Sequence, residues 1–212
     1  MQSTTNAPRS LKEKQRQERE TLILQAAEEV FLDKGYYETT IDEIAARVGI
    51  AKGTVYLHFP SKEDLLFAIF TRDTQRLQEN IEARVTEITT PQAKLEAIFT
   101  TMYQSFFDQR MCLPYLLHSN AELHRLFTEK RGLKREKWEW VSRLVQSLLD
   151  EGKASGVFDA TIPTPIMLQA FFGPLSLHIR ERLLEEQHMS PDVAVGHLRR
   201  LYFKSIASVQ GE

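Results

Sequence analysis

The sequence contains one cysteine, Cys112, in 212 residues. A single cysteine excludes a disulfide within the chain and any zinc site that is built from several cysteines. A low cysteine content is also typical of proteins that work in a reducing compartment, so we expect a cytoplasmic protein.

Long apolar runs are missing as well. The longest purely apolar run covers residues 65–70, whereas a helix that crosses a bilayer needs about 20 predominantly apolar residues. The first 20 residues are polar and lack the apolar stretch of an export signal. We therefore expect a protein without a membrane segment.

The signatures of several function classes are absent. With 27 Lys and Arg against 29 Asp and Glu, the net charge of -2 excludes a histone-like polycation. Glycine-rich phosphate loops, the Gly-x-Ser-x-Gly nucleophile motif and the His-Glu-x-x-His zinc motif do not occur. His118 and His124 are six residues apart, which does not place two metal ligands on one helix face. We predict no enzyme, cofactor or metal site, although a catalytic group assembled from distant residues stays open.

Helical periodicity is present along most of the chain. Apolar residues between positions 22 and 31 recur on one helix face, and Gly35 is a candidate C-cap. A capping residue precedes proline at 90–91, 164–165 and 190–191, which is a helix start signal. No segment shows the alternation of a strand. The sequence therefore predicts an all-α fold.

Two short helices are predicted between residues 40 and 60. Thr40 and Glu43 form a capping box that opens the first helix, and Gly49 closes it. The second helix covers residues 52–59, with Ala51, Val55 and Phe59 facing inward, and a proline follows it. Two short helices joined by a glycine turn are typical of a helix-turn-helix. A further box, residues 61–64, opens a long helix that reaches the upper eighties and is a candidate lever between domains.

The outward face of the second short helix is polar and aromatic. No acidic residue occurs between Ile44 and Lys62, which suits an approach to phosphates, and such side chains reach base edges in a major groove. The pattern favours DNA binding, although helix-turn-helix units also serve in protein contacts and Tyr56 can be a packing residue. The face and its flanks comprise Lys52, Gly53, Thr54, Tyr56, Leu57 and His58.

This region resembles a known family. The segments GYYETTIDEIA at 35–45, VGIAKGTVYLHF at 48–59 and SKEDL at 61–65 are similar to the N-terminal signature of TetR-family transcriptional regulators. The resemblance covers about residues 20–66. It implies a cytoplasmic homodimer that binds a palindromic operator, usually as a repressor. It also implies release from DNA when a small molecule occupies a C-terminal pocket.

The resemblance also implies roles for single residues. By position, Thr40 would hold a phosphate, and His58 and Lys62 would hold backbone phosphates. Many relatives have an aromatic phosphate-contacting residue where this chain has Leu57, which cannot donate a hydrogen bond and instead suits a thymine methyl or a sugar. The residues that would meet bases and backbone are Lys52, Gly53, Thr54 and Tyr56.

We predict two domains. Residues 1–60 form a three-helix DNA-binding domain, and residues 61–212 form a larger helical domain for effector binding and dimerisation. The first domain is expected to include a disordered basic N-terminal arm of about residues 1–19, whose first ten residues are small and polar. Residues 1–19 carry five basic residues against two acids, which fits a solvated helix start or a basic arm beside the phosphates.

The last two predicted helices, about 165–186 and 191–209, are apolar on more than one side. One side can face the protein's own core and another a second subunit, so we expect a homodimer through these helices; the alternative is a helix central to a monomer core. Gly173 and Pro174 should kink the first of the two.

The C-terminal part is rich in methionine and aromatic residues, which suit a pocket for a bulky apolar ligand and equally suit an ordinary core. This composition predicts a hydrophobic or amphipathic effector. The candidate ligand-binding residues are Met102, Phe106, Met111, Tyr115, Trp138, Phe171 and His178.

These observations predict a ligand-responsive transcriptional repressor. The first alternative is an all-α small-molecule carrier or enzyme that keeps a vestigial helix-turn-helix. The second is a nucleoid-type binder without sequence preference, against which the net charge of -2 argues.

Overall fold

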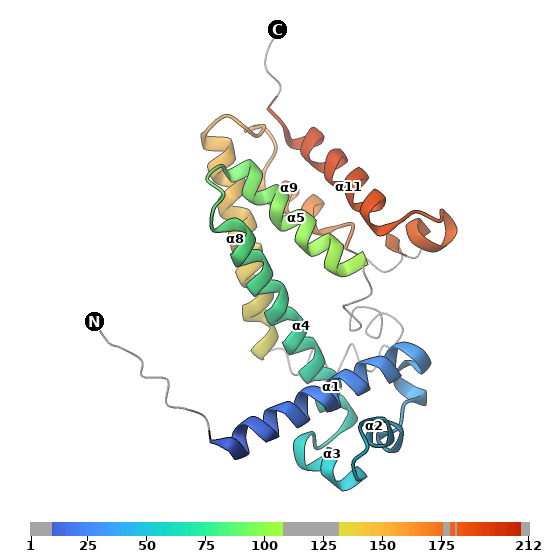
Figure 1. Cartoon of the computed structure of the whole chain (residues 1–212). Coiled ribbons are helices and arrows are strands. Elements are labelled where there is room, and N and C mark those ends of the chain that lie inside the picture. Colours follow the sequence, from blue (N-terminus) through green and yellow to red (C-terminus); the bar gives the residue numbers. More distant parts are fainter. Residues whose placement is uncertain (1–9, 108–131, 176–178, 181, 209–212) are drawn as a thin grey trace, which may run out of the picture. The chain divides into compact units, whose positions relative to one another are not determined.

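The computed structural model describes residues 10–107, 132–175, 179–180 and 182–208 (Figure 1). These residues form helices, and their one sheet-like feature is an isolated antiparallel bridge between Phe158 and Ala207. The all-α prediction is confirmed. In chain order the elements are α1 (Leu11–Glu38), α2 (Ile41–Val48), α3 (Lys52–His58), α4 (Lys62–Val85), α5 (Pro91–Phe107), α8 (Gly132–Ala154), α9 (Thr164–Phe172), the π-helical turn η1 (Arg182–Glu186) and α11 (Pro191–Ile206).

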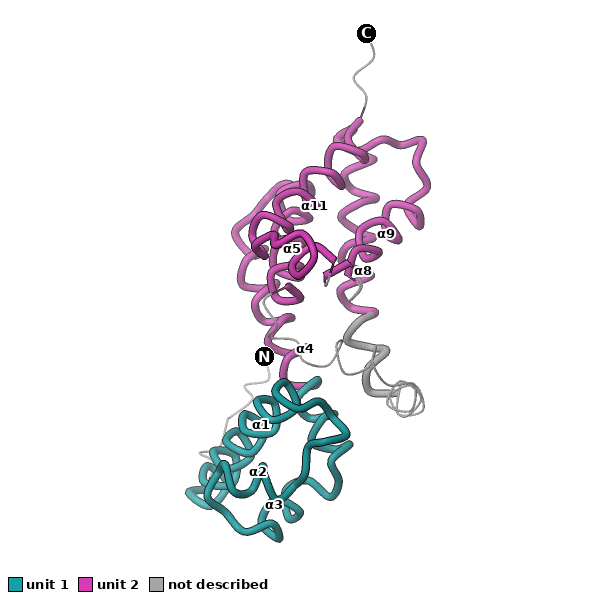
Figure 2. Tube along the Cα trace, turned by 90° about the vertical axis from the view of Figure 1, so that its right-hand side faces the viewer, with its two compact units in different colours: residues 1–70 teal, residues 71–212 magenta. Residues whose placement is uncertain are grey.

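The chain divides into two compact units, residues 1–70 and 71–212, coloured separately in Figure 2. The division falls inside α4, so no loop separates the units. The functional division into residues 1–60 and 61–212 stays a prediction.

In the N-terminal unit, α1 begins at a capping box that the sequence analysis missed, so residues 11–19, predicted as part of a disordered arm, are helical. The Glu13 N–H donates to Ser10 Oγ over 3.3 Å, and the Ser10 N–H donates to Glu13 Oε2 over 3.0 Å. Gly35 interrupts the helical backbone with φ 78° and ψ 173°, a conformation that favours glycine. The chain resumes a helical turn after Gly35 and ends α1 at Glu38.

The helices α2 and α3 follow the predicted helix-turn-helix. Gly49 caps α2 in the left-handed region, with φ 75°, and α3 ends before Pro60. Ala51 is exposed rather than inward-facing, because it is the extended N-cap of α3 and does not share the helical phase of Val55. The fully buried side chains of this unit are Ile23, Ala27, Phe31, Ile44, Val55, Leu65, Leu66 and Ile69.

In the C-terminal unit, α5, α8, α9 and α11 pack side by side (Figures 1 and 2). The centre of their core is aromatic: Phe99 stacks on Tyr103 with ring centroids 3.9 Å apart, and Phe171 meets Phe99 edge-on. Two buried hydroxyls join this core to α9. Tyr103 donates to the Phe171 carbonyl over 2.6 Å, and Tyr202 donates to the Met167 carbonyl over 3.0 Å.

The predicted helix over 165–186 is wrong in its length. The α9 helix ends at Phe172, where Gly173 caps it and Pro174 follows. Gly173 keeps helical dihedral angles, with φ -54° and ψ -45°, but Pro174 has no N–H to continue the helical hydrogen bonds, so α9 ends here. The final helix, α11, ends at Ile206 instead of residue 209.

Within the described residues, no helix combines the length and the apolar character that crossing a membrane requires. The same residues contain no group of three or more side chains suited to holding a metal ion.

Candidate nucleic-acid interface

Helix α3 presents an exposed face. Val55 and Phe59 anchor the helix in the core, which turns the opposite side to solvent. Tyr56 is 43% exposed and Leu57 80% exposed. A Cβ added at Gly53 would meet no atom within 4 Å, so another molecule can approach the backbone there. We call this the recognition face; it comprises Lys52, Gly53, Tyr56 and Leu57, with Thr54 half-buried at its margin.

Lys52, at the start of α3, is paired with an acidic side chain. Its Nζ lies 2.6 Å from Asp42 Oδ2 in α2, and both side chains are exposed. This hydrogen bond raises the pKa of Lys52 above its ordinary value. The segment without acids in the sequence is therefore not free of acids in space, and Lys52 must exchange Asp42 for a phosphate to contact DNA.

Thr40 caps α2 in the predicted manner. Its Oγ1 accepts a hydrogen bond from the Glu43 N–H over 3.3 Å and donates to Glu43 Oε2 over 3.1 Å. Glu43 also accepts from the Lys34 ammonium, and this hydrogen bond, with those from Thr40, lowers the pKa of Glu43 to about 2. The hydroxyl predicted to hold a phosphate already has an internal partner.

His58, at the end of α3, turns toward α1. Its side chain is 9% exposed, and Nδ1 lies 3.1 Å from Glu20 Oε1. Arg16 donates to the same carboxylate oxygen over 3.0 Å. Burial raises the pKa of Glu20, but the hydrogen bonds from His58 and Arg16 outweigh burial and leave the pKa lowered. His58 thus ties α3 to α1 and does not belong to the recognition face.

Lys62 also turns inward. Its ammonium donates to the carbonyl oxygens of Tyr36 over 2.6 Å and Thr39 over 2.9 Å, and it lies 4.3 Å from the centre of the Tyr36 ring. Burial lowers the pKa of Lys62. The Tyr36 hydroxyl in turn donates to Glu63. Lys62 therefore caps the C-terminal end of α1.

The sequence analysis missed the partners of these cations. Glu20, Asp42 and Tyr36 lie 38, 10 and 26 residues from the side chains that they meet. Helical periodicity reports which residues share a face of one helix, and it carries no signal for pairs between helices.

The predicted effector residues fall into two groups. Met102, Phe106 and Phe171 are buried in the core of the C-terminal unit. Met111, Tyr115 and His178 lie outside the described residues, and so does the side chain of Trp138. The prediction that these residues bind a ligand stays a prediction.

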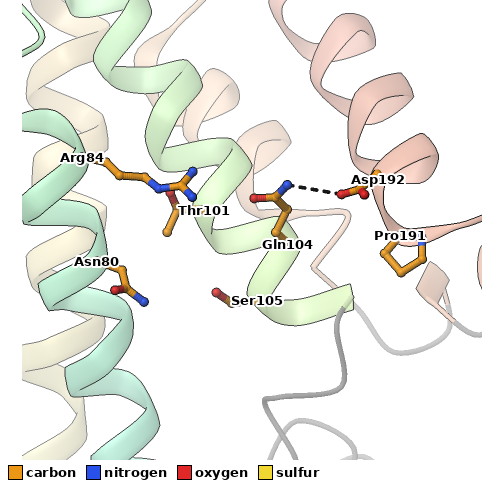
Figure 3. A pocket seen from close by; sticks show the side chains of 7 residues that line it. All are labelled: Asn80, Arg84, Thr101, Gln104, Ser105, Pro191 and Asp192. Atoms are coloured by element: carbon orange, nitrogen blue, oxygen red, sulfur yellow. Dashed lines mark hydrogen bonds between the residues drawn. The ribbon is translucent and has the colours of Figure 1, made fainter.

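Two hollows open between helices of the C-terminal unit. The first, of about 530 Å³, lies between α4, α5 and the start of α11 and is lined by polar side chains (Figure 3). In it Gln104 donates to Asp192 over 3.3 Å. The second, of about 600 Å³, lies between α5 and α11. Of the predicted ligand residues that the structure describes with their side chains, which are Met102, Phe106 and Phe171, none lines either hollow.

Comparison with known proteins identifies the N-terminal unit. Residues 23–69 match the family model described as "Bacterial regulatory proteins, tetR family". That match contains α2, α3 and the whole recognition face.

Relatives extend the likeness along the chain. The fatty acid metabolism regulator protein of Bacillus subtilis is 26% identical over 175 residues, which are 82% of this chain and 88% of that protein. The HTH-type transcriptional activator FasR of Mycolicibacterium smegmatis is 37% identical over 93 residues, 44% of this chain and 41% of FasR.

A solved structure supports the fold. The transcriptional regulator FadR of Bacillus subtilis, solved in complex with stearoyl-CoA, superposes with a TM-score of 0.70 at 23% identity, over 88% of this chain and 98% of that one. Since the matched residues carry the helix-turn-helix and these relatives are regulators, the protein is a DNA-binding transcriptional regulator, not an enzyme. The chain belongs to the TetR family of bacterial regulatory proteins.

Proposed function

We propose that this protein is a cytoplasmic repressor that binds a palindromic operator as a homodimer and leaves it when a small amphipathic molecule binds. The recognition face of α3, exposed inside the residues that match the family, is the observation that carries the proposal. A helix of this kind reads base edges from the major groove, and a palindrome provides one half-site for each subunit.

The contacts on DNA follow from the side chains available. Tyr56 and Thr54 reach base edges, Leu57 packs on a thymine methyl or a sugar, and Lys52 leaves Asp42 for a phosphate. Exchanging the exposed pair of Lys52 and Asp42 costs little free energy, because surface ion pairs are worth about 0–1 kcal/mol. Thr40, His58 and Lys62 remain proposed phosphate contacts. Each of the three side chains already has a hydrogen-bond partner within the protein, so it would have to bind a phosphate in addition to that partner.

A homodimer is supported by apolar side chains that the C-terminal unit leaves in solvent. Ile166 on α9 is 60% exposed and Leu201 on α11 is 70% exposed. Val193 lies two turns before Leu201 on the same face of α11 and is also exposed. Covering these side chains with the same helices of a second subunit gives the closed two-fold arrangement that is commonest among soluble oligomers.

The proposed effector class is a long-chain acyl-CoA thioester. The support is the relative in Bacillus subtilis whose structure holds stearoyl-CoA. Such a molecule is amphipathic, with an apolar chain and a polar nucleotide end, and so belongs to the class that the C-terminal composition predicts. Effector binding then favours dimers whose recognition helices no longer fit successive major grooves, which lie about 34–36 Å apart. We propose α4, which belongs to both units, as the element that carries this change.

The first test is binding to DNA. Purified protein is used to enrich genomic fragments, which are footprinted at moderate salt, and a protected palindrome is expected. Tyr56→Ala and Lys52→Ala should each weaken operator binding at least tenfold without unfolding the protein, because both side chains are exposed on the recognition face. Arg143→Ala, an exposed cation in the C-terminal unit, is the matched control. Unchanged affinity in both variants would reject the assignment of the recognition face.

The second test is release. Stearoyl-CoA is expected to lower operator occupancy, whereas stearate and coenzyme A supply the two halves of the molecule as controls. A rise in occupancy would indicate an activator-like response, which the name of the relative FasR makes worth measuring. Tight ligand binding or turnover with no affinity for any DNA would favour the carrier or enzyme with a vestigial helix-turn-helix.

A further inference from the structure

The hollow between α5 and α11 carries an unusual cluster of positive charge. Arg199, Arg200 and Lys204 on α11 line it and are all exposed. We call this hollow the basic groove. The carboxylate lining it, that of Glu96 on α5, accepts a hydrogen bond from the Gln92 amide over 3.0 Å. Three cations therefore face one carboxylate that already has a partner.

These three cations lie together and are unpaired, unlike several other exposed arginines of the described surface. Within the described residues none of them has an ion pair or a side-chain hydrogen bond, whereas Arg16, Arg47, Arg143 and Arg182 each lie within 4 Å of a carboxylate. Arg200 and Lys204 are four residues apart on one helix, a spacing at which like charges destabilise the helix. The helix dipole favours Lys204 near its C-terminus, but Arg199 and Arg200 lie more than a turn before the end. An anion bound in the groove would offset this repulsion.

The walls of the groove suit a ligand with a planar part. Phe203 is half-buried, and its ring meets Tyr202 and Phe99 edge-on at centroid distances of 5.1 and 5.9 Å. The part of the ring that stays exposed borders the groove. Gly196 leaves space as well, because a Cβ there would meet no atom within 4 Å. The volume of about 600 Å³ lies within the range usual for small-molecule sites.

We propose that the basic groove binds the phosphate groups of a nucleotide, with the two arginines on the phosphates and the base against Phe203. A guanidinium group can donate two parallel hydrogen bonds to one phosphate, and nucleotide bases stack on aromatic rings. Where the ligand is an acyl-CoA, the groove holds its phosphorylated ADP end; only this assignment rests on the proposed function. Duplex DNA is a poorer fit to the basic groove than a nucleotide. The cations of the groove lie within residues 199–204, which extend only about 8 Å along the helix, and they do not form a longer row.

The test uses the full chain and calorimetric titration with three probes: coenzyme A, adenosine 3′,5′-bisphosphate and stearoyl-CoA. Arg199→Gln combined with Arg200→Gln removes the charge and keeps side-chain length. We expect this double variant to bind coenzyme A at least tenfold more weakly than the unchanged protein, with the difference shrinking as salt rises. Arg143→Gln combined with Arg182→Gln, which alters exposed cations of the same unit outside the groove, should leave the affinity unchanged.

The outcomes separate the two proposals. The proposed nucleotide site would be rejected if the unchanged protein bound neither nucleotide probe at millimolar concentration. It would also be rejected if the Arg199→Gln, Arg200→Gln variant bound coenzyme A as tightly as the unchanged protein. Loss of operator binding in that variant, with coenzyme A binding intact, would make the groove a DNA contact instead. Groove-dependent binding of coenzyme A with no effect of stearoyl-CoA on the operator would uphold the groove and reject the proposed effector.

Discussion

At the scale of single residues, Lys62 shows how one cation can be assigned in two ways. The resemblance implies a phosphate contact, whereas the structure directs the ammonium to the carbonyls of Tyr36 and Thr39. We predict that Lys62→Met lowers the free energy of unfolding by about 1–3 kcal/mol, because two partly buried carbonyls lose a charged donor.

Urea unfolding measures this effect, and Lys52→Met is the control. Lys52 is exposed and its replacement should change the unfolding free energy by less than about 0.5 kcal/mol. Unchanged stability of Lys62→Met together with a tenfold loss of operator affinity would instead support the phosphate contact.

Two helical glycines make opposite predictions. A Cβ at Gly152 would lie 2.1 Å from the Phe158 ring, so Gly152→Ala should destabilise the protein by about 1–3 kcal/mol through overpacking. A Cβ at Gly196 meets nothing, so Gly196→Ala should stabilise α11 by up to about 1 kcal/mol. Thermal unfolding of both variants compares the signs, and a destabilised Gly196→Ala would contradict the open space above that residue.

At the scale of elements, the start of α2 depends on pH. The pKa of Glu43 is about 2 in the folded protein, against an ordinary value of 4.5, because Lys34 and Thr40 hydrogen-bond to the carboxylate. A depressed folded pKa gives stability that is complete above pH 4.5 and is lost as the pH falls toward 2. We predict that the difference in unfolding free energy between the unchanged protein and Glu43→Gln is constant from pH 7 to 5 and much smaller at pH 3.

Urea midpoints at pH 7, 5 and 3 provide the measurement. The glutamine keeps the capping hydrogen bonds and removes the charge, so it isolates the ionised form. A difference that is as large at pH 3 as at pH 7 would show that Glu43 acts through shape rather than charge.

The elements also show what the sequence can and cannot predict. Most helix starts were predicted well, because the signal is local: Thr40 caps α2, Thr90 caps α5 and Ser190 caps α11. The predicted cap Thr164 is wrong, since it is the first residue of α9 and Pro163 precedes the helix without a side-chain cap. The end of α9 was predicted wrongly, because a Gly-Pro pair can bend or break a helix and the surrounding packing decides. On the recognition face, Tyr56 and Leu57 were predicted to be exposed and are exposed.

The orientation of His58 and Lys62 was beyond prediction. Their partners lie on α1, and which helices meet at which residues depends on the tertiary fold. The core positions of Met102 and Phe171 illustrate the same limit, since an apolar stripe does not distinguish a filled core from a ligand pocket.

At the scale of the whole molecule, the exposed apolar side chains of the C-terminal unit predict an effect on assembly. Leu201→Glu should convert the proposed dimer to a monomer, because it would bury an unpaired charge in the interface. Operator affinity should fall with it, since one subunit reads only half of a palindrome. Sedimentation velocity measures the mass, and Leu32→Glu, a change of an exposed leucine on α1, is the control. A dimer that survives Leu201→Glu would place the interface elsewhere.

The two buried tyrosines of the C-terminal unit have a consequence for uniqueness. In a core made of aromatic rings alone, a helix can shift along its neighbours, since one ring can replace another with little loss of buried apolar area. A buried hydroxyl that donates to one particular carbonyl on α9 opposes such a shift, because a shift by one residue would leave the hydroxyl and the carbonyl buried without a hydrogen-bond partner. The hydrogen bonds of Tyr103 and Tyr202 thus fix α9 in a single register between its neighbours.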